Sequence, residues 1–372
     1  MLQSPSRFRR QTLAAVAAGL SLGPLAHAQT AEAPAAAPIE LNVPADVKPV
    51  ALGDDALDLE NADKLKGVKK AVLASVAVYV ITEASGAATA GAAFRDRNMA
   101  SASTSLKVTG LDPARLQALA DDAHDQALAA FRARGIEVMS PEALKALPEF
   151  AALAALGDKN PLAVDAQAGK GTVFSARGLP LFHLDEQVLL NRMVGGLFGA
   201  KVEDPYVSLG DKMAGGFRKA NLDTALDKLA KASDSTVLMV RLVLTAAQVK
   251  AAGGAFSLSA STAARDTLFM PAWTNRVLAH TPAGARGRAS LKYALVSETP
   301  PGQIVDVTST GTKVANVATT VVTFAAALSG VGRGVAVSTQ DLEMRTTPQW
   351  FDAVARPQVQ ATLEGLAKGL AP

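Results

Sequence analysis

The sequence has no cysteine and few aromatic residues. Of its 372 residues, 5% are Phe, Trp or Tyr, and four are histidine. Without cysteine the chain can form no disulfide, thiolate nucleophile or thiolate metal site, so its folded part must depend on a hydrophobic core. The scarcity of aromatic side chains disfavours a surface on which nucleic-acid bases stack.

Local catalytic and nucleotide-binding motifs are also absent. The chain contains neither G-x-S-x-G nor G-x-x-x-x-G-K-[ST], and the glycines of SGVGRGV lack the spacing of a dinucleotide loop. We therefore predict no catalytic residues, no cofactor and no metal site. Dispersed residues, such as the carboxylate pair of a glycosidase, would escape a search of this kind.

The first 28 residues have the pattern of a secretory signal peptide. Three arginines precede an apolar run from Leu13 to Leu22, and the sequence AHA ends at Ala28. This pattern predicts export to the periplasm with cleavage after Ala28. The apolar run is too short for a permanent membrane-spanning helix. The pair Arg9-Arg10 leaves both the general and the twin-arginine export routes open.

Cleavage would change the charge balance of the chain. The full sequence has 37 basic and 34 acidic residues, but residues 1–28 contain three arginines and no acid. The remaining chain is therefore neutral. A neutral chain argues against a nucleic-acid partner, because such partners are usually bound through a basic surface.

Residues 29–64 are predicted to be a disordered linker. They include TAEAPAAAPIELNVPADVKPV, which is rich in Ala and Pro and has no aromatic residue. This composition is typical of segments that cannot bury a core. We expect the linker to be dispensable for folding.

Residues 65–372 are predicted to form an α/β domain, a layered mixed sheet with flanking helices, with a possible subdivision near residue 170. Val68–Ile81 is rich in β-branched residues, which indicates a strand buried on both faces. Asp112-Pro113 is a typical helix start, and Gly135 is a typical helix end. A short strand and a second helix beginning at Ser140-Pro141 follow. This alternation is typical of layered α/β domains.

The order of these elements resembles that of a known group of envelope proteins. VKKAVLASVAVYV, a loop of small residues, a long helix and GIEVMSPEAL follow one another as in the periplasmic α/β domain of curli-secretion lipoproteins and the amino-terminal domain of TolB. STVLMVRLVL and ASLKYALVSETPPGQIV resemble later strands of that group. The resemblance runs from Val68 to the end of the chain and implies a role in envelope transport or assembly. Gln29 stands where a lipoprotein has its lipid-bearing cysteine, and Lys170–Gly216 has no counterpart.

Three histidines remain after the predicted cleavage. His124 shares a helix face with Asp121 and could begin a metal site with His183 or His280, but a solvated acidic patch is the simpler interpretation. His183 lies near two acids and could act as a general base, but a hydrogen-bonded surface histidine is the simpler interpretation.

Two segments are the predicted contact surfaces: the part of a small-residue loop from Ala84 to Ser105, and the uncharged segment 314–332. Thr82–Ser105 is predicted to be a long loop of small residues, in which Phe94, Arg95 and Arg97 would dominate any contact. The segment 314–332 has no charged residue and is predicted to be a buried or partner-facing helix, with peripheral membrane contact as an alternative.

Together these features predict a binding function in cell-envelope assembly or transport, with an envelope protein as partner. Two alternatives stay open: a carrier of a lipid or small apolar ligand, and a periplasmic hydrolase with dispersed catalytic residues.

Overall fold

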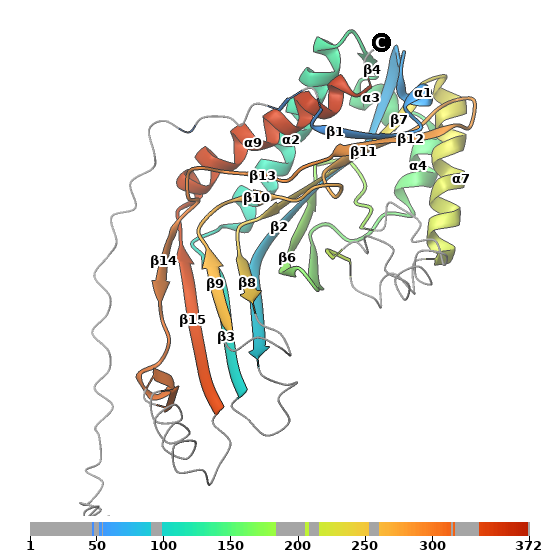
Figure 1. Ribbon diagram of the computed structural model, residues 1–372. Helices are drawn as coiled ribbons and strands as arrows, with labels where there is room; N and C mark the ends of the chain where they lie inside the picture. The colour runs from blue at the N-terminus through green and yellow to red at the C-terminus, as the bar shows by residue number, and fades with distance from the viewer. Residues whose placement is uncertain are drawn as a thin grey trace, which may run out of the picture. The chain divides into compact units, whose positions relative to one another are not determined.

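The protein is built on a large mixed β-sheet flanked by helices (Figure 1). The computed structural model describes residues 47, 52–53, 55–90, 99–183, 205–207, 216–252, 260–313, 315–316 and 335–370. Within these residues the main sheet has 13 strands, and a separate hairpin has two. The predicted fold class, a layered mixed α/β sheet with flanking helices, is confirmed.

The central path of the main sheet runs in the order β1-β12-β11-β7-β2-β3-β15-β14. These strands are β1 (Leu57–Glu60), β12 (Arg286–Leu291), β11 (Arg276–His280), β7 (Thr236–Thr245), β2 (Lys70–Ala90), β3 (Met99–Thr109), β15 (Val335–Arg345) and β14 (Gln303–Asp306). Five shorter strands pair beside this path: β4 (Glu137–Val138), β5 (Leu162–Ala166), β6 (Gly169–Ser175), β10 (Phe269–Met270) and β13 (Leu295–Val296).

Strand β2 connects two different parts of this sheet. Its first half pairs in parallel with β7 from Ala71 to Ile81, and its second half pairs antiparallel with β3 from Glu83 to Ala90. The first half is buried on both faces, as the β-branched sequence predicts. We call strands β1, β12, β11 and β7, residues 70–81 of β2 and the helices that pack on them the sheet body.

Two helices of the sheet body begin where the sequence predicts, after Asp112 and after Ser140. The helices are α1 (Ala62–Leu65), α2 (Pro113–Ala133), α3 (Pro141–Lys145), α4 (Pro148–Ala154), α7 (Gly216–Ser233) and α9 (Pro348–Lys368). Asp112 caps α2 by accepting a hydrogen bond from the backbone N–H of Ala114, and Ser140 caps α3 in the same way. No helix among the described residues is both long and apolar enough to cross a membrane.

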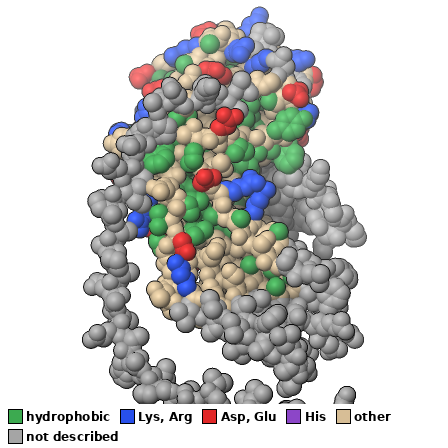
Figure 2. Space-filling view, turned by 60° about the vertical axis from the view of Figure 1, so that its left-hand side comes forward, with side chains coloured by type: hydrophobic (Ala, Val, Ile, Leu, Met, Phe, Trp, Pro, Cys, Tyr) green, Lys and Arg blue, Asp and Glu red, His purple; other side chains and the backbone are tan. Residues whose placement is uncertain are grey.

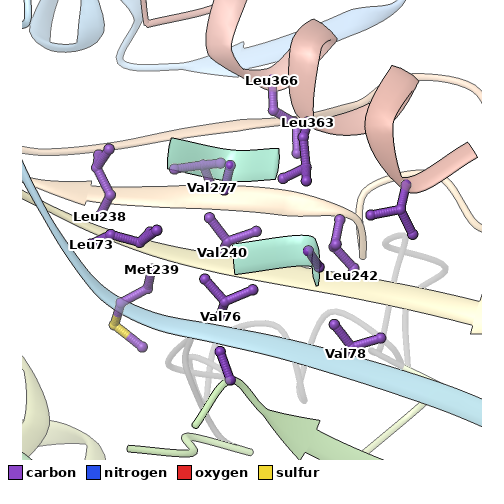
Figure 3. Packing of buried hydrophobic residues seen from close by; sticks show 14 of the residues in the cluster. Leu73, Val76, Val78, Leu238, Met239, Val240, Leu242, Val277, Leu363 and Leu366 are labelled. Carbon is purple, nitrogen blue, oxygen red and sulfur yellow. The ribbon is translucent and has the colours of Figure 1, made fainter. Parts of the chain in front are cut away.

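The main hydrophobic core lies between the sheet and its helices. Figure 3 shows Leu363 and Leu366 of α9 beside Val277 of β11, with Val240 of β7 and Val76 of β2 on the next two strands of the sheet. All five side chains are almost fully buried. This packing supplies the hydrophobic stabilisation that a chain without disulfides requires.

The folded chain begins earlier than the predicted linker boundary. Within residues 29–64, β1 pairs antiparallel with β12 and α1 follows directly. Leu65, at the end of α1, is fully buried and packs closely against Gly287 of β12. The acidic run around β1 therefore belongs to a sheet edge, where alternate polar residues face solvent.

The prediction that Thr82–Ser105 forms one long loop is wrong. Strand β2 continues to Ala90 and β3 begins at Met99, so most of the segment is strand. A run of small residues without large apolar neighbours is typical of a loop in a sequence. Here these residues form strands and allow another pair of strands to pack closely on them. The predicted subdivision near residue 170 falls in the hairpin of β5 and β6.

Candidate binding surface

Beyond the sheet body, three strands continue together as a ribbon of small residues. We call residues 83–90 of β2, 99–107 of β3 and 335–343 of β15 the strand extension. Strand β3 pairs antiparallel with β2 and parallel with β15 along this length. In Figure 1 the labelled helices lie above the strand extension, which points downward.

One face of the strand extension is covered by a hairpin. Strands β8 (Gln248–Ala252) and β9 (Ser261–Arg265) pair with each other and pack across β2 and β3. The Oγ1 atoms of Thr104 and Thr262 are 2.6 Å apart across this interface. A Cβ atom added at Gly86 would lie 2.7 Å from Cγ1 of Val249, so the layers approach closely because residue 86 has no side chain.

The opposite face carries hydroxyl and methyl groups. We call it the open face, and its side chains are exposed or half-buried: Ser85, Ala87, Thr89, Ser101, Ser103, Ser105, Val337, Thr339 and Asp341. Ser103 Oγ donates to Thr339 Oγ1 at 3.2 Å, and Ser105 Oγ donates to Asp341 Oδ1 at 2.7 Å. Figure 2 shows charged side chains mainly in the upper part of the described surface and mostly neutral ones below.

A polar groove lies at the base of the open face. It has a volume of about 420 Å³ and is lined by Glu83, Ala84, Ser85, Ser105, Leu106, Lys107, Asp165, Ala166, Gln167, Gly169 and Lys170. Two ion pairs contribute to it, Glu83 with Lys107 at 3.2 Å and Asp165 with Lys170 at 3.4 Å. The groove thus offers charge of both signs together with hydroxyl groups, which suits a polar ligand better than an apolar one.

One edge of the strand extension is left without a neighbouring strand. Glu83 pairs with Lys107 of β3 and also with Lys170 of β6, so β3 and β6 lie on opposite edges of β2. Strand β6 begins at Gly169, and no strand in the described part of the chain pairs with that edge of β2 from Ala84 to Ala90. The backbone groups along this edge can therefore accept another strand.

The outer edge of β15 is better covered. Strand β14 pairs with it from Leu342 to Arg345, and Thr308 bonds both the N–H and the C=O of Asp341. The side chain of Asn316 donates to the carbonyl of Thr339 at 2.9 Å. The two edges of the strand extension are thus unequal.

His183, one of the candidate catalytic histidines, lies in a buried polar cluster. Its Nδ1 and its carbonyl oxygen are each 3.0 Å from Tyr79 Oη, and its backbone N–H donates to Asp158 at 2.9 Å. The guanidinium of Arg241 stacks on the Tyr79 ring at 4.3 Å. The expectation of a surface histidine is wrong, because only 5% of His183 is exposed. The cluster sits inside the fold, away from the open face.

The buried arginine has a second arginine opposite it. Arg276 of β11 is the cross-strand partner of Arg241 of β7, and both are almost fully buried. Sequence analysis missed both, although Arg241 interrupts the apolar run of β7, which was a signal for a buried arginine.

The other two histidines have separate partners. His124 pairs with Asp125 at 3.1 Å, while Asp121 bonds Arg177 at 3.1 Å, so these two residues have different partners. Among the described residues no group of three or more potential ligands could hold a metal ion.

His280 belongs to a charged network that holds α7 on the sheet. Its Nδ1 is 2.9 Å from Asp227 of α7, and Arg286 of β12 bonds both Asp227 and Asp223. Burial alone would raise the pKa of Asp227, but the hydrogen bonds and charges of His280 and Arg286 outweigh it and lower that pKa. The network joins α7 to the turn between β11 and β12.

The predicted contact residues Phe94, Arg95 and Arg97 lie outside the described residues, as does all of the segment 314–332 except Ala315 and Asn316. Sequence analysis also missed the open face, although serine occupies every second position from Ser101 to Ser105, an alternation that is typical of a strand.

Comparisons of the chain with protein-family models, with curated proteins and with solved structures found no match.

Proposed function

We propose that the protein is exported to the periplasm and acts by binding a protein of the cell envelope through the open face of the strand extension. The observation that carries this proposal is the position of that face. It projects beyond the sheet body and presents mostly small, uncharged side chains on three strands, with Asp341 at its base.

The strand extension adds little to the stability of the sheet body. Ordering each residue costs about 1–2 kcal/mol of backbone entropy, whereas Ser, Ala and Gly side chains bury little apolar area in return. Of its side chains, Leu106 is one of the few large apolar ones that are buried. A role in contacting another molecule explains why the protein has a strand extension that adds little stability.

The chemistry of the open face fits a polypeptide partner. Hydroxyl groups donate and accept hydrogen bonds without the desolvation cost of burying a charge. The pairs Ser103–Thr339 and Ser105–Asp341 fix these hydroxyls in rows along the strands. A mostly uncharged surface of paired strands is suited to a second sheet or an extended chain.

The proposal is tested by site-specific photo-crosslinking in intact cells. A crosslinking amino acid at Ser103 should give a discrete adduct with another envelope protein, whereas one at Arg134, an exposed residue at the end of α2, should not. Equal adduct patterns at the two positions would remove the open face as the contact surface.

Export is tested separately. The amino terminus of the purified cellular protein should be Gln29, and full-length protein found only in the cytoplasm would exclude the periplasmic role.

A further inference from the structure

We propose that two copies of this chain join edge to edge through residues 84–90 of β2, antiparallel and centred on Ala87. The proposal concerns an edge rather than the open face, so it stands independently of the proposed function.

The edge from Ala84 to Ala90 lacks the features that usually prevent strand pairing. Natural edge strands are kept apart by shortness, charged residues, proline or bulges. Strand β1 is four residues long and carries Asp58 and Glu60, and β14 is equally short. The edge of β2 is seven residues long and contains only Ala, Ser, Gly and Thr.

The sequence of this edge is nearly its own mirror image in chemical character. Antiparallel pairing about Ala87 would set Ala84 opposite Ala90, Ser85 opposite Thr89, Gly86 opposite Ala88, and Ala87 opposite its own copy. No charges meet in this register, and the Ser85–Thr89 pairs can hydrogen-bond across the strands. A twofold interface requires self-complementarity of this kind.

The position of β6 selects the same register. Strand β6 occupies the edge of β2 up to Glu83, which pairs with Lys170. With the twofold axis at Ala87, each copy uses all the positions from Ala84 to Ala90 and none that β6 already occupies. The covering hairpins, β8 with β9, would lie on the same side of both copies, because the axis is perpendicular to the sheet.

Pairing in this way would join the two open faces. The strands would follow one another as β15, β3 and β2 of one copy and then β2, β3 and β15 of the other. The shared face would be twice as wide as that of one copy. The second copy would also cover the unpaired backbone groups of β2.

Single cysteines test this arrangement cleanly, because the chain has none of its own. Purified Ala87→Cys protein should form a disulfide-linked dimer on oxidation, since the two copies of residue 87 would be directly opposite. Ser103, the cross-strand neighbour of Ala87 on β3, provides the matched control. Three strand spacings, about 14 Å, would separate its two copies, beyond the roughly 7 Å that a disulfide can bridge.

A charge substitution gives the second measurement. Ala87→Lys should halve the molar mass found by light scattering, because like charges would face each other across the axis. Ser103→Lys should leave the dimer intact. Residue 87 is exposed, so circular dichroism should show both variants folded.

Two outcomes would overturn the proposal. One is equal disulfide yield for Ala87→Cys and Ser103→Cys. The other is a dimer mass that Ala87→Lys leaves unchanged, with cross-linking instead from Gln340→Cys on β15.

Discussion

The two halves of β2 are one continuous strand with opposite properties. From Lys70 to Ile81 it is aliphatic, buried on both faces and flanked by β7. From Glu83 to Ala90 it consists mainly of small residues, with one face under a hairpin and one edge that no other described strand pairs with beyond Glu83. The comparison shows that strand formation needs neither large side chains nor a deep core once neighbouring strands fix the register. Stability is concentrated in the first half, and accessible surface in the second.

The largest expected difference comes from placing a carboxylate in each half. Val78→Asp should prevent folding, because Val78 is fully buried and an unpaired charge there has no compensating partner. Thr89→Asp should change the free energy of unfolding by less than about 0.5 kcal/mol, because Thr89 is exposed. Urea unfolding measures both. Similar stabilities for the two variants would contradict the division of β2.

Truncation should show how far the sheet body depends on its outermost strand. Deleting residues 29–65 removes β1 and α1, including the buried Leu65, and should lower the thermal midpoint by about 5 °C or more. Deleting only residues 29–46 should leave the midpoint nearly unchanged. Scanning calorimetry compares the two deletion variants, and equal midpoints would show that β1 and α1 are dispensable.

Replacing one glycine beside the sheet body and one in the strand extension by alanine tests how rigidly the two regions are packed. At Gly171 of β6 the added methyl group would collide with the backbone carbonyl of Val80, which cannot move without breaking the sheet. Gly171→Ala should therefore cost about 3 kcal/mol. At Gly86 the added group meets the Val249 side chain of the covering hairpin, so Gly86→Ala should cost about 1 kcal/mol or less. Chemical denaturation should reproduce this order, and the reverse order would mean that the hairpin packs more rigidly than the sheet.

The smallest expected difference concerns acid sensitivity. The pKa of Asp227 is below its ordinary value of 3.8, so its contribution is complete above that pH and is lost as pH falls through the lowered pKa. Asp227→Asn should cost about 1 kcal/mol at pH 7, and the difference from the native chain should shrink below pH 4.

Asp306→Asn is the control for this experiment. Hydrogen bonds from Thr308 lower the pKa of Asp306 as well, with a further contribution from Lys313, but this group lies at the surface beside the strand extension. Its replacement should therefore have a smaller effect. An effect of Asp306→Asn as large as that of Asp227→Asn would show that burial of the α7 network adds nothing.

The sheet body was predictable because its signals are local. The β-branched run of β2, the apolar run of β7 and the Asp112-Pro113 helix start each act within a few residues, and all three elements form where expected. The stretch ASLKYALVSETPPGQIV does contain strands on both sides of Pro300–Gly302, but β13 pairs with β10 and β14 with β15. Which strand pairs with which depends on contacts between residues that are distant in the sequence, and a local sequence pattern does not contain that information.

The candidate site was predictable only in outline. The sequence directed attention to Thr82–Ser105 as a contact segment but assigned it the wrong structure. Its strands are held by Val249 and Thr262, which lie more than 140 residues away in the chain. The buried cluster of Tyr79, His183 and Arg241 was missed for the same reason, because it assembles from three distant segments.

The continuity of β2 has a mechanical consequence. A load applied along the strand extension passes directly into the segment that pairs with β7 from Ala71 to Ile81. Because the hydrogen bonds of that pairing lie across the direction of pull, they would be sheared together rather than opened one after another. We expect high resistance to stretching along this axis and low resistance to peeling of β3 from the edge of β2. A partner that pulls on the far end of the strand extension would therefore transmit tension into the sheet body before the pairing of β2 with β7 breaks.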